Sequence, residues 1–185
     1  MGSEMCIRDR ATTVNAGNLL VTGNIGGSTT TVNAGGTLLG NGTVGAVNVV
    51  GGTLSPGNGA GTLTTGAVTL DSASFLKFEL AQAGIVGGVN DLLSVGGNLT
   101  LDGTLQVTEL SPLANGNYRL FNYAGTLANN VLNLESAFLA AHPGASIDAT
   151  VPGQITLLVP EPGALMSLLG GMGVLVGLRR LRRTA

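Results

Sequence analysis

Few side chains in this 185-residue sequence could take part in catalysis, and they are scattered along it. Lys77 and Glu79 share one face of a predicted strand over 71–80, a pairing that lyase chemistry on a sugar acid would use. The single histidine, His142, precedes Pro143-Gly144 without a serine or cysteine partner placed to act as a nucleophile. More simply, Lys77 and Glu79 are a solvated pair opposite a buried stripe of apolar side chains. His142 is more simply a surface histidine. The sequence therefore predicts no catalytic residues and no enzymatic activity.

Metal ligands are equally scarce in the sequence. The segment Gly87-Gly88-Val89-Asn90-Asp91 is similar to half of a calcium-binding β-roll repeat, but it occurs once and with altered spacing. The single cysteine, Cys6, cannot form an internal disulfide, and no set of Cys and His residues could hold zinc. The sequence accordingly assigns no metal site and no cofactor.

Charged residues make up only 10% of the chain, compared with about 25% in a typical soluble domain. Between Ala11 and Leu178, two basic residues, Lys77 and Arg119, accompany eight acidic ones. This acidic body has no basic stripe that could neutralise phosphates, so nucleic acid is excluded as a partner. Most other basic residues lie at the end of the chain, and they are Arg179, Arg180, Arg182 and Arg183.

The first ten residues, MGSEMCIRDR, match neither the composition nor the pattern of the rest of the chain. They resemble the adapter-derived stretch that is translated at the ends of some metagenomic reading frames, so we interpret 1–10 as a non-native scar. They also lack the apolar run of a secretory signal. If the protein is exported, we expect its natural N-terminus to be missing from this sequence.

From Ala11 onward the chain repeats itself every 16 to 18 residues. The sequence TTVNAG at 12–17 recurs at 30–35, and a looser copy, VNVVGG, spans 47–52. Each copy predicts a short strand, a glycine turn and another short strand. One coil of such strands cannot bury its apolar face alone, whereas stacked coils can. The repeats predict an all-β parallel solenoid of about seven coils, with an antiparallel sandwich or meander as the alternative.

The second half of the body is less regular and carries turn signals. Asp102-Gly103, between 99–101 and 104–107, and Asn115-Gly116, before 118–121, are dipeptides that favour hairpins. They predict that a solenoid over 11–125 ends in a hairpin-like C-terminal cap, with cap and linker strands over 126–158. A short helix over 133–141, N-capped by Asn133, and two strands over 146–151 and 154–159 complete this prediction.

The body resembles the passenger region of autotransporter-associated β-strand repeat proteins. The matching segments are the TVNAGGTL copies, GTLSPGN at 52–58, and NDLLSV at 90–95 leading into GTL at 103–105. The resemblance covers 11 to about 125 and implies a right-handed parallel β-helix on the cell exterior. The outer-membrane barrel that would follow such a passenger needs about eight or more strands. Because no residues remain for it, we do not expect a self-secreting autotransporter.

The segment 159–185 has a three-part pattern. Pro160-Glu161-Pro162 precedes an uncharged run over 163–178, which ends at the arginine cluster. The uncharged run falls just short of a usual membrane span, but Leu181 and snorkelling arginines bring it within range. The positive-inside rule places the arginines in the cytoplasm. The pattern predicts a single C-terminal transmembrane helix, with a buried C-terminal helix as the alternative.

This tail resembles the PEP-CTERM sorting signal. The resemblance implies export by the general secretory machinery, retention in the inner membrane, and processing near Pro160-Glu161-Pro162 by an exosortase. The mature protein would then reach the cell surface or the exopolysaccharide matrix, so exopolysaccharide is a further expected partner. Together the patterns predict a structural or adhesive surface protein. The alternative is a fragment of a carbohydrate-active β-helix enzyme whose catalytic coils lie upstream.

Overall fold

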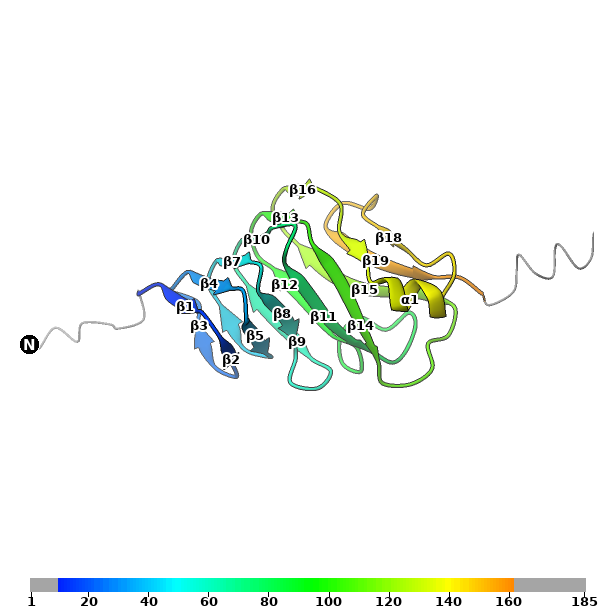
Figure 1. The fold of residues 1–185 in the computed structure, drawn as a ribbon, viewed down its shortest axis with the longest axis horizontal. Coiled ribbons are helices and arrows are strands. Elements are labelled where there is room, and N and C mark those ends of the chain that lie inside the picture. The colour runs from blue at the N-terminus through cyan, green and yellow to red at the C-terminus, as the bar shows by residue number, and fades with distance from the viewer. Residues whose placement is uncertain (1–9, 162–185) are drawn as a thin grey trace, which may run out of the picture.

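The computed structural model describes residues 10–161, which form a solenoid of three sheets (Figure 1). From β1 to β18 every third strand along the chain joins the same sheet, so each coil adds one strand to each of sheets A, B and C. The strands of sheet A are β1 (Thr12–Val14), β4 (Thr30–Asn33), β7 (Val47–Val50), β10 (Val68–Leu70), β13 (Leu99–Leu101) and β16 (Leu127–Asn129). Those of sheet B are β2 (Gly17–Leu20), β5 (Gly36–Gly40), β8 (Thr53–Pro56), β11 (Phe75–Leu80), β14 (Thr104–Glu109) and β17 (Asn133–Leu134). Sheet C contains β3 (Asn24–Ile25), β6 (Thr43–Val44), β9 (Thr62–Thr65), β12 (Leu92–Val95), β15 (Gly116–Tyr123), β19 (Gln154–Val159) and β18 (Ser146–Asp148).

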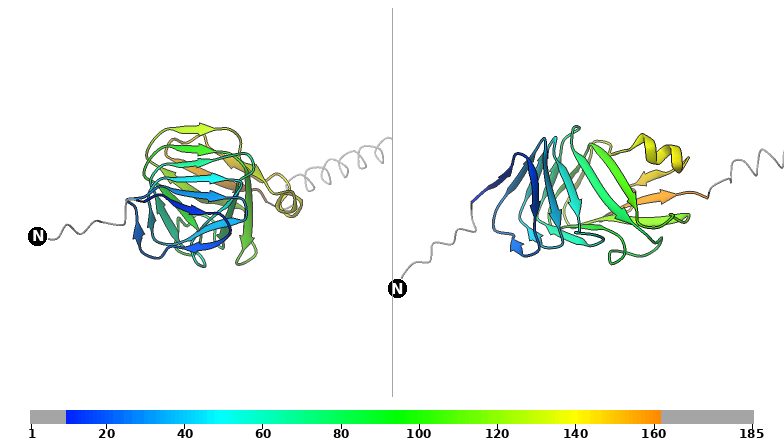
Figure 2. Two further views of the ribbon diagram at one scale, coloured as in Figure 1. Left: turned by 60° about the vertical axis from the view of Figure 1, so that its left-hand side comes forward. Right: turned by 60° about the horizontal axis from the view of Figure 1, so that its bottom comes forward.

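The strand pairing confirms the all-β class and the parallel stack that the repeats predict. From β4 to β17 each strand pairs in parallel with the strand three places before it. In the left view of Figure 2 the strands of successive coils lie one above another. This arrangement excludes the antiparallel sandwich or meander.

The coils grow longer along the chain. Thr12 pairs with Thr30, 18 positions later, and Thr30 pairs with Val47, 17 positions later. Val68, by contrast, pairs with Leu99, 31 positions later, because a long loop separates β11 from β12. The described residues therefore form five complete coils and two strands of a sixth. The prediction of about seven coils was wrong because it assumed a constant coil length.

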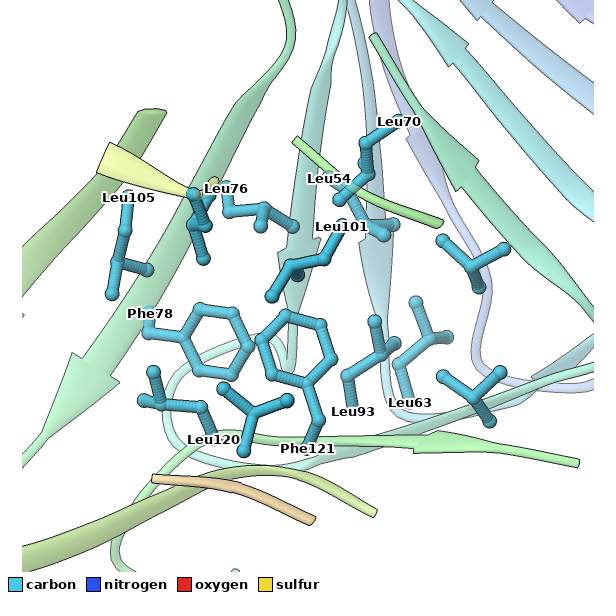
Figure 3. Close-up of a cluster of buried hydrophobic side chains, with 14 of the residues drawn as sticks. Leu54, Leu63, Leu70, Leu76, Phe78, Leu93, Leu101, Leu105, Leu120 and Phe121 are labelled. Atoms are coloured by element: carbon cyan, nitrogen blue, oxygen red, sulfur yellow. The ribbon is translucent and has the colours of Figure 1, made fainter. Parts of the chain in front are cut away.

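The core consists of ladders of identical or similar side chains that run along the stack. The longest ladder belongs to sheet B and contains Leu19, Leu38, Leu54, Leu76, Leu105 and Leu134. Alternate residues of each strand point inward, which puts one side chain of every coil directly above its counterpart in the previous coil. From β11 onward, larger side chains lie beside this ladder. There the rings of Phe78 and Phe121 pack with their centroids 5.4 Å apart (Figure 3).

The dipeptide Asp102-Gly103 lies at a corner between two sheets, so the predicted hairpin there was wrong. The strand before it, β13, belongs to sheet A, and the strand after it, β14, belongs to sheet B. Gly103 has a φ of +86°, and a Cβ on it would collide with the carbonyl oxygen of Ser74 in the coil below. Gly103 therefore allows a sharp corner at which two backbone segments approach closely. The local sequence of such a corner does not differ from that of a hairpin turn.

The C-terminal end of the solenoid is covered by antiparallel strands, although not through the predicted turns. β19 pairs antiparallel with both β15 and β18. Gly116, the second predicted hairpin residue, is instead the first residue of β15, whose partners are β12 and β19. The predicted bounds 154–159 of the last strand are confirmed, whereas the strand predicted over 146–151 ends at Asp148.

The predicted helix exists but starts later than expected. It is α1 (Ser136–Ala141), preceded by Glu135 at the cap position, whose side chain makes no capping hydrogen bond. Asn133, the predicted N-cap, lies in β17, where it pairs with Thr104. In the part of the chain that the structure describes, no helix is long and apolar enough to cross a membrane. The membrane span predicted over 163–178 and most of the predicted scar over 1–10 lie outside the described residues.

Candidate functional site

The loop between β11 and β12 is held from inside by Asn90, whose side chain is fully buried. Its Oδ1 accepts hydrogen bonds from the backbone N–H groups of Ala81 and Gln82, at 2.7 and 3.0 Å. Its Nδ2 donates to the carbonyl oxygens of Gln82 and Ile85, at 2.7 and 2.8 Å. One amide side chain therefore satisfies four backbone groups and fixes the shape of the loop.

Asp91, the next residue, is also fully buried and connects three segments of the chain. Its Oδ1 accepts from the backbone N–H of Gly61 at 2.9 Å, and its Oδ2 accepts from that of Glu79 at 2.7 Å. The pKa of this carboxyl is raised from 3.8 to about 7, because burial, together with a smaller contribution from the Glu79 carboxylate, outweighs the two N–H donors, which lower it. The similarity to half of a calcium repeat thus coincides with a structural role for Asn90 and Asp91. Within 10–161 the structure shows no group of three or more potential metal ligands.

Lys77 and Glu79 lie on the outer face of β11, as the alternation of the strand predicts. Leu76, Phe78 and Leu80 point inward and are fully buried. Across the sheet, Lys77 is paired with Gln106 and Glu79 with Thr108. The two charged side chains share a face without forming an ion pair within the described part of the chain.

His142 is held by contacts that the sequence did not predict. Its Nε2 lies 2.7 Å from Oε1 of Glu109, the last residue of β14, and its ring centroid lies 4.6 Å from that of Phe138. The residue is half-buried rather than free on the surface. Because 33 positions separate the pair, no local signal could have identified it. The contact joins the end of α1 to sheet B, and no serine or cysteine takes part in it.

The outer faces of the first coils are uncharged and contain rows of polar side chains. On sheet A, the outward residues of successive strands are Thr13, Thr31, Asn48, Thr69 and Thr100. On sheet B, a similar row contains Asn18, Thr37 and Thr53. The sequence has no charged residue from 11 to 70. These coils therefore present rows of hydroxyl and amide groups, which can donate and accept hydrogen bonds.

An open groove of about 200 Å³ lies on the outer face of sheet C, near its C-terminal edge. Its floor contains a row of three side chains, Asp148 of β18, Thr156 of β19 and Arg119 of β15. They point to the same face because directly paired residues on neighbouring antiparallel strands do so. Asn117 and Gln154 extend the floor on either side of this row.

Arg119 lies directly before an irregularity in β15. The register with β19 shifts between Arg119 and Phe121, so Leu120 and Phe121 both point into the core. Such a bulge changes the direction of the side chains next to it. Arg119 remains on the outer face, where its Nη1 donates to Oδ1 of Asn122 at 2.8 Å. The guanidinium keeps further N–H donors that can face the groove.

The groove carries one positive and one negative charge that do not pair with each other. Asp148 and Arg119 are separated by the width of two strands, about 10 Å, and no ion pair involves either of them in 10–161. The hydroxyl and backbone N–H of Thr150 donate to Asp148 at 2.6 and 2.8 Å, which lowers the pKa of this carboxyl. Asp148 is therefore ionised at neutral pH.

Exposed apolar side chains border the same groove. Ile85 and Val86, from the loop that Asn90 holds, are 42% and 51% exposed, and Val151 is 46% exposed. The backbone N–H of Gly84 donates to the carbonyl oxygen of Asn117 at 2.8 Å, which ties the loop to the groove floor. The result is a shallow site with a charged and polar floor and an apolar border.

The predicted processing motif begins directly after the last strand. Val159 ends β19 and is buried, whereas Pro160 and Glu161 are exposed. Nδ2 of Asn115 donates to Oε1 of Glu161 at 3.0 Å. Pro162 and the four arginines of the predicted membrane stop, Arg179, Arg180, Arg182 and Arg183, lie outside the described residues.

Comparisons with known proteins give one informative similarity. No protein-family model matches the sequence. Over 117 residues, or 60% of this chain, the sequence is 46% identical to the adhesin BmaC autotransporter of Brucella suis biovar 1 (strain 1330). The chain spans only 3% of the length of that relative. The body is thus similar to a short stretch of an autotransporter adhesin, which fits a passenger-like repeat.

Proposed function

We propose that the body is a surface-exposed adhesive module with a passenger-like fold. The observation that carries this proposal is the 46% identity to a stretch of an autotransporter adhesin. The stack of parallel coils supports it, because solenoids offer extended surfaces for binding. In this proposal the solenoid is right-handed, as nearly all parallel strand crossovers are.

We propose further that the body has no enzymatic activity. Two observations support this assignment. Asp91 is buried among backbone donors, and His142 contacts Glu109 rather than a nucleophile. Lys77 and Glu79 point outward from β11, away from the groove on sheet C that contains Arg119. These side chains are therefore not gathered around one reacting centre, as general acid–base or nucleophilic catalysis would require.

The segment 159–185 acts in this proposal as a sorting signal of the PEP-CTERM type. Pro160 and Glu161 are exposed directly after β19, and prolines keep a chain extended, so a protease can approach the motif there. The general secretory machinery exports the chain, and the span over 163–178 retains it in the inner membrane with its arginines in the cytoplasm. An exosortase then processes the motif, and the mature protein passes to the cell surface or the exopolysaccharide matrix.

A bead-retention assay tests the adhesive role. Beads coated with the full chain are passed over immobilised matrix proteins, cultured epithelial cells and purified exopolysaccharide, and retention under flow is counted. We expect retention of the wild-type beads on at least one of these surfaces. The matched control is Gly103→Val, which places a side chain against the Ser74 carbonyl and prevents the corner from closing. Equal retention of wild-type, Gly103→Val and uncoated beads on every surface would contradict adhesion.

Cell fractionation tests the sorting signal. The chain is given a secretion signal and an epitope tag upstream of Val159, and it is expressed in a host that contains an exosortase. Deletion of 163–185 should release the protein into the periplasm. Replacing the four arginines by glutamine should weaken retention, because each arginine resists crossing the bilayer centre by about 2.5–3.5 kcal/mol.

Replacement of Pro160, Glu161 and Pro162 by alanine is the matched variant for the processing step. It should leave membrane insertion intact and block maturation, because the hydrophobic run and the arginines are unchanged. The sorting proposal is wrong if the tail-deleted protein still pellets with the inner membrane. It is equally wrong if the alanine variant matures to the normal size.

A further inference from the structure

The groove on sheet C combines opposite charges and exposed apolar side chains within one small site. Arg119 and Asp148 stand at the two ends of its floor row, and Ile85, Val86 and Val151 border it. An open space of about 200 Å³ accommodates a few residues of an extended chain but not a folded domain. Charged and apolar groups that alternate over a few ångströms are typical of a polypeptide in a strand conformation.

The border of the groove is held in place before any ligand arrives. Asn90 fixes the loop that carries Ile85 and Val86 through four hydrogen bonds, and Gly84 ties that loop to Asn117. The floor belongs to three paired strands. A site that is already ordered loses less conformational entropy when it binds.

The side chains of the groove favour a polypeptide over a carbohydrate. No aromatic residue lines the groove, so it offers no flat ring against which a sugar could stack. The exposed Ile85, Val86 and Val151 instead match apolar side chains of a peptide.

We propose that this groove binds an extended polypeptide segment, with an acidic side chain of the ligand on Arg119 and an apolar side chain against Ile85 and Val86. A guanidinium group forms two parallel hydrogen bonds with a carboxylate, which selects Glu or Asp over their amides. The proposal rests on the adhesive function proposed above, because it names the class of partner that such a function would use.

Two peptide libraries test the proposal against the full chain. One contains hexapeptides with a fixed central glutamate flanked by valine or isoleucine, and the other has glutamine in place of the glutamate. Binding is measured by fluorescence anisotropy. We expect the glutamate library to bind about 10-fold more tightly than the glutamine library, as a charge-assisted hydrogen bond to Arg119 implies. Arg119→Gln should abolish that preference, and Val86→Asp should weaken both libraries.

Lys77→Gln is the matched control, because it removes the other basic side chain of the body from the outer face of sheet B, outside the groove. It should leave the preference of about 10-fold unchanged, and circular dichroism verifies that each variant is folded. Equal binding of the two libraries overturns the proposal. So does binding of oligogalacturonate that Arg119→Gln abolishes, since the groove would then be a carbohydrate site. If wild-type beads adhere but the chain shows no preference between the two peptide libraries, the adhesive function is supported and only the groove proposal is overturned.

Discussion

The N-terminal and C-terminal halves of the body share one stacking scheme but differ in coil length and charge. In 11–70, paired residues of successive coils are 16 to 21 positions apart, and no side chain is charged. In 71–159 the parallel pairs are 28 or 29 positions apart, and every charged residue of the body up to Val159 lies there. The groove and the antiparallel cap also belong to this second half.

The comparison shows what a longer coil requires and what it makes possible. A constant coil length keeps the ladders in register and needs only apolar and small polar side chains. The extra residues between β11 and β12 leave backbone groups inside the molecule that need partners, and Asn90 and Asp91 provide them. The same loop carries Ile85 and Val86 to the groove. Binding residues are commonly found on loops that a rigid scaffold positions.

Removing the Asn90 side chain should have the largest effect on stability. Asn90→Ala leaves two buried N–H groups and two carbonyl groups without their partner, so we expect unfolding to become easier by about 3–5 kcal/mol. Urea denaturation measures the change. The matched variant in the N-terminal half, whose coils are regular, is Asn18→Ala. Asn18 is exposed on the outer face, so we expect the free energy of unfolding to change by less than about 0.5 kcal/mol. Similar losses in the two variants would remove the distinction between the halves.

The stability of the C-terminal half should depend on pH through Asp91. Its pKa is about 7 in the folded protein and 3.8 ordinarily, so between these values the folded state holds a proton that the unfolded state releases. The free energy of unfolding therefore falls as pH rises from about 4 to 7 and then levels off. The midpoint of thermal unfolding, measured across this range, reports the trend.

Asp91→Asn is the control for this dependence. It places an amide nitrogen opposite a backbone donor, so the variant is less stable at every pH. Between about pH 4 and 7, however, the free energy of unfolding of the variant should not decline as that of the wild type does. If the wild-type and variant curves run parallel through that range, Asp91 does not titrate as its burial implies.

A smaller effect, of opposite sign, is expected in the regular half. Thr30 belongs to an inward row between Thr12 and Val47, and its hydroxyl is buried without a hydrogen-bond partner in the described structure. Thr30→Val should stabilise the protein by about 1 kcal/mol, because an unpaired polar group is removed at similar volume. Thr31→Val, on the outer face, should bring no such gain. Chemical denaturation of the two variants decides between them.

The regular half could be predicted from the sequence because its structure depends on local repetition. The TTVNAG copies 18 residues apart become paired strands, with Thr12 opposite Thr30. In the second half, the alternation of Leu76, Phe78 and Leu80 with polar residues predicted which face of β11 is buried. The first pattern reflects the length of one coil, and the second reflects the two-residue period of a strand.

The groove and the corner at Gly103 could not be predicted, because they depend on which sheet each strand joins. Asp102-Gly103 has the same local signal at a corner as in a hairpin. Arg119, Thr156 and Asp148 become neighbours only through the antiparallel pairing of β15, β19 and β18. The bulge that turns both Leu120 and Phe121 into the core has no signature in the sequence.

The position of β19 between β15 and β18 has a mechanical consequence. The chain leaves the solenoid at Val159, so a pull on the segment beyond it would enter the molecule through this strand. Hydrogen bonds on both edges of β19 resist such a pull, whereas a terminal strand would have bonds on one edge only. Forced unfolding is governed by the unfolding rate. An adhesive module tethered at this end would therefore transmit tension through a strand that is anchored on both sides.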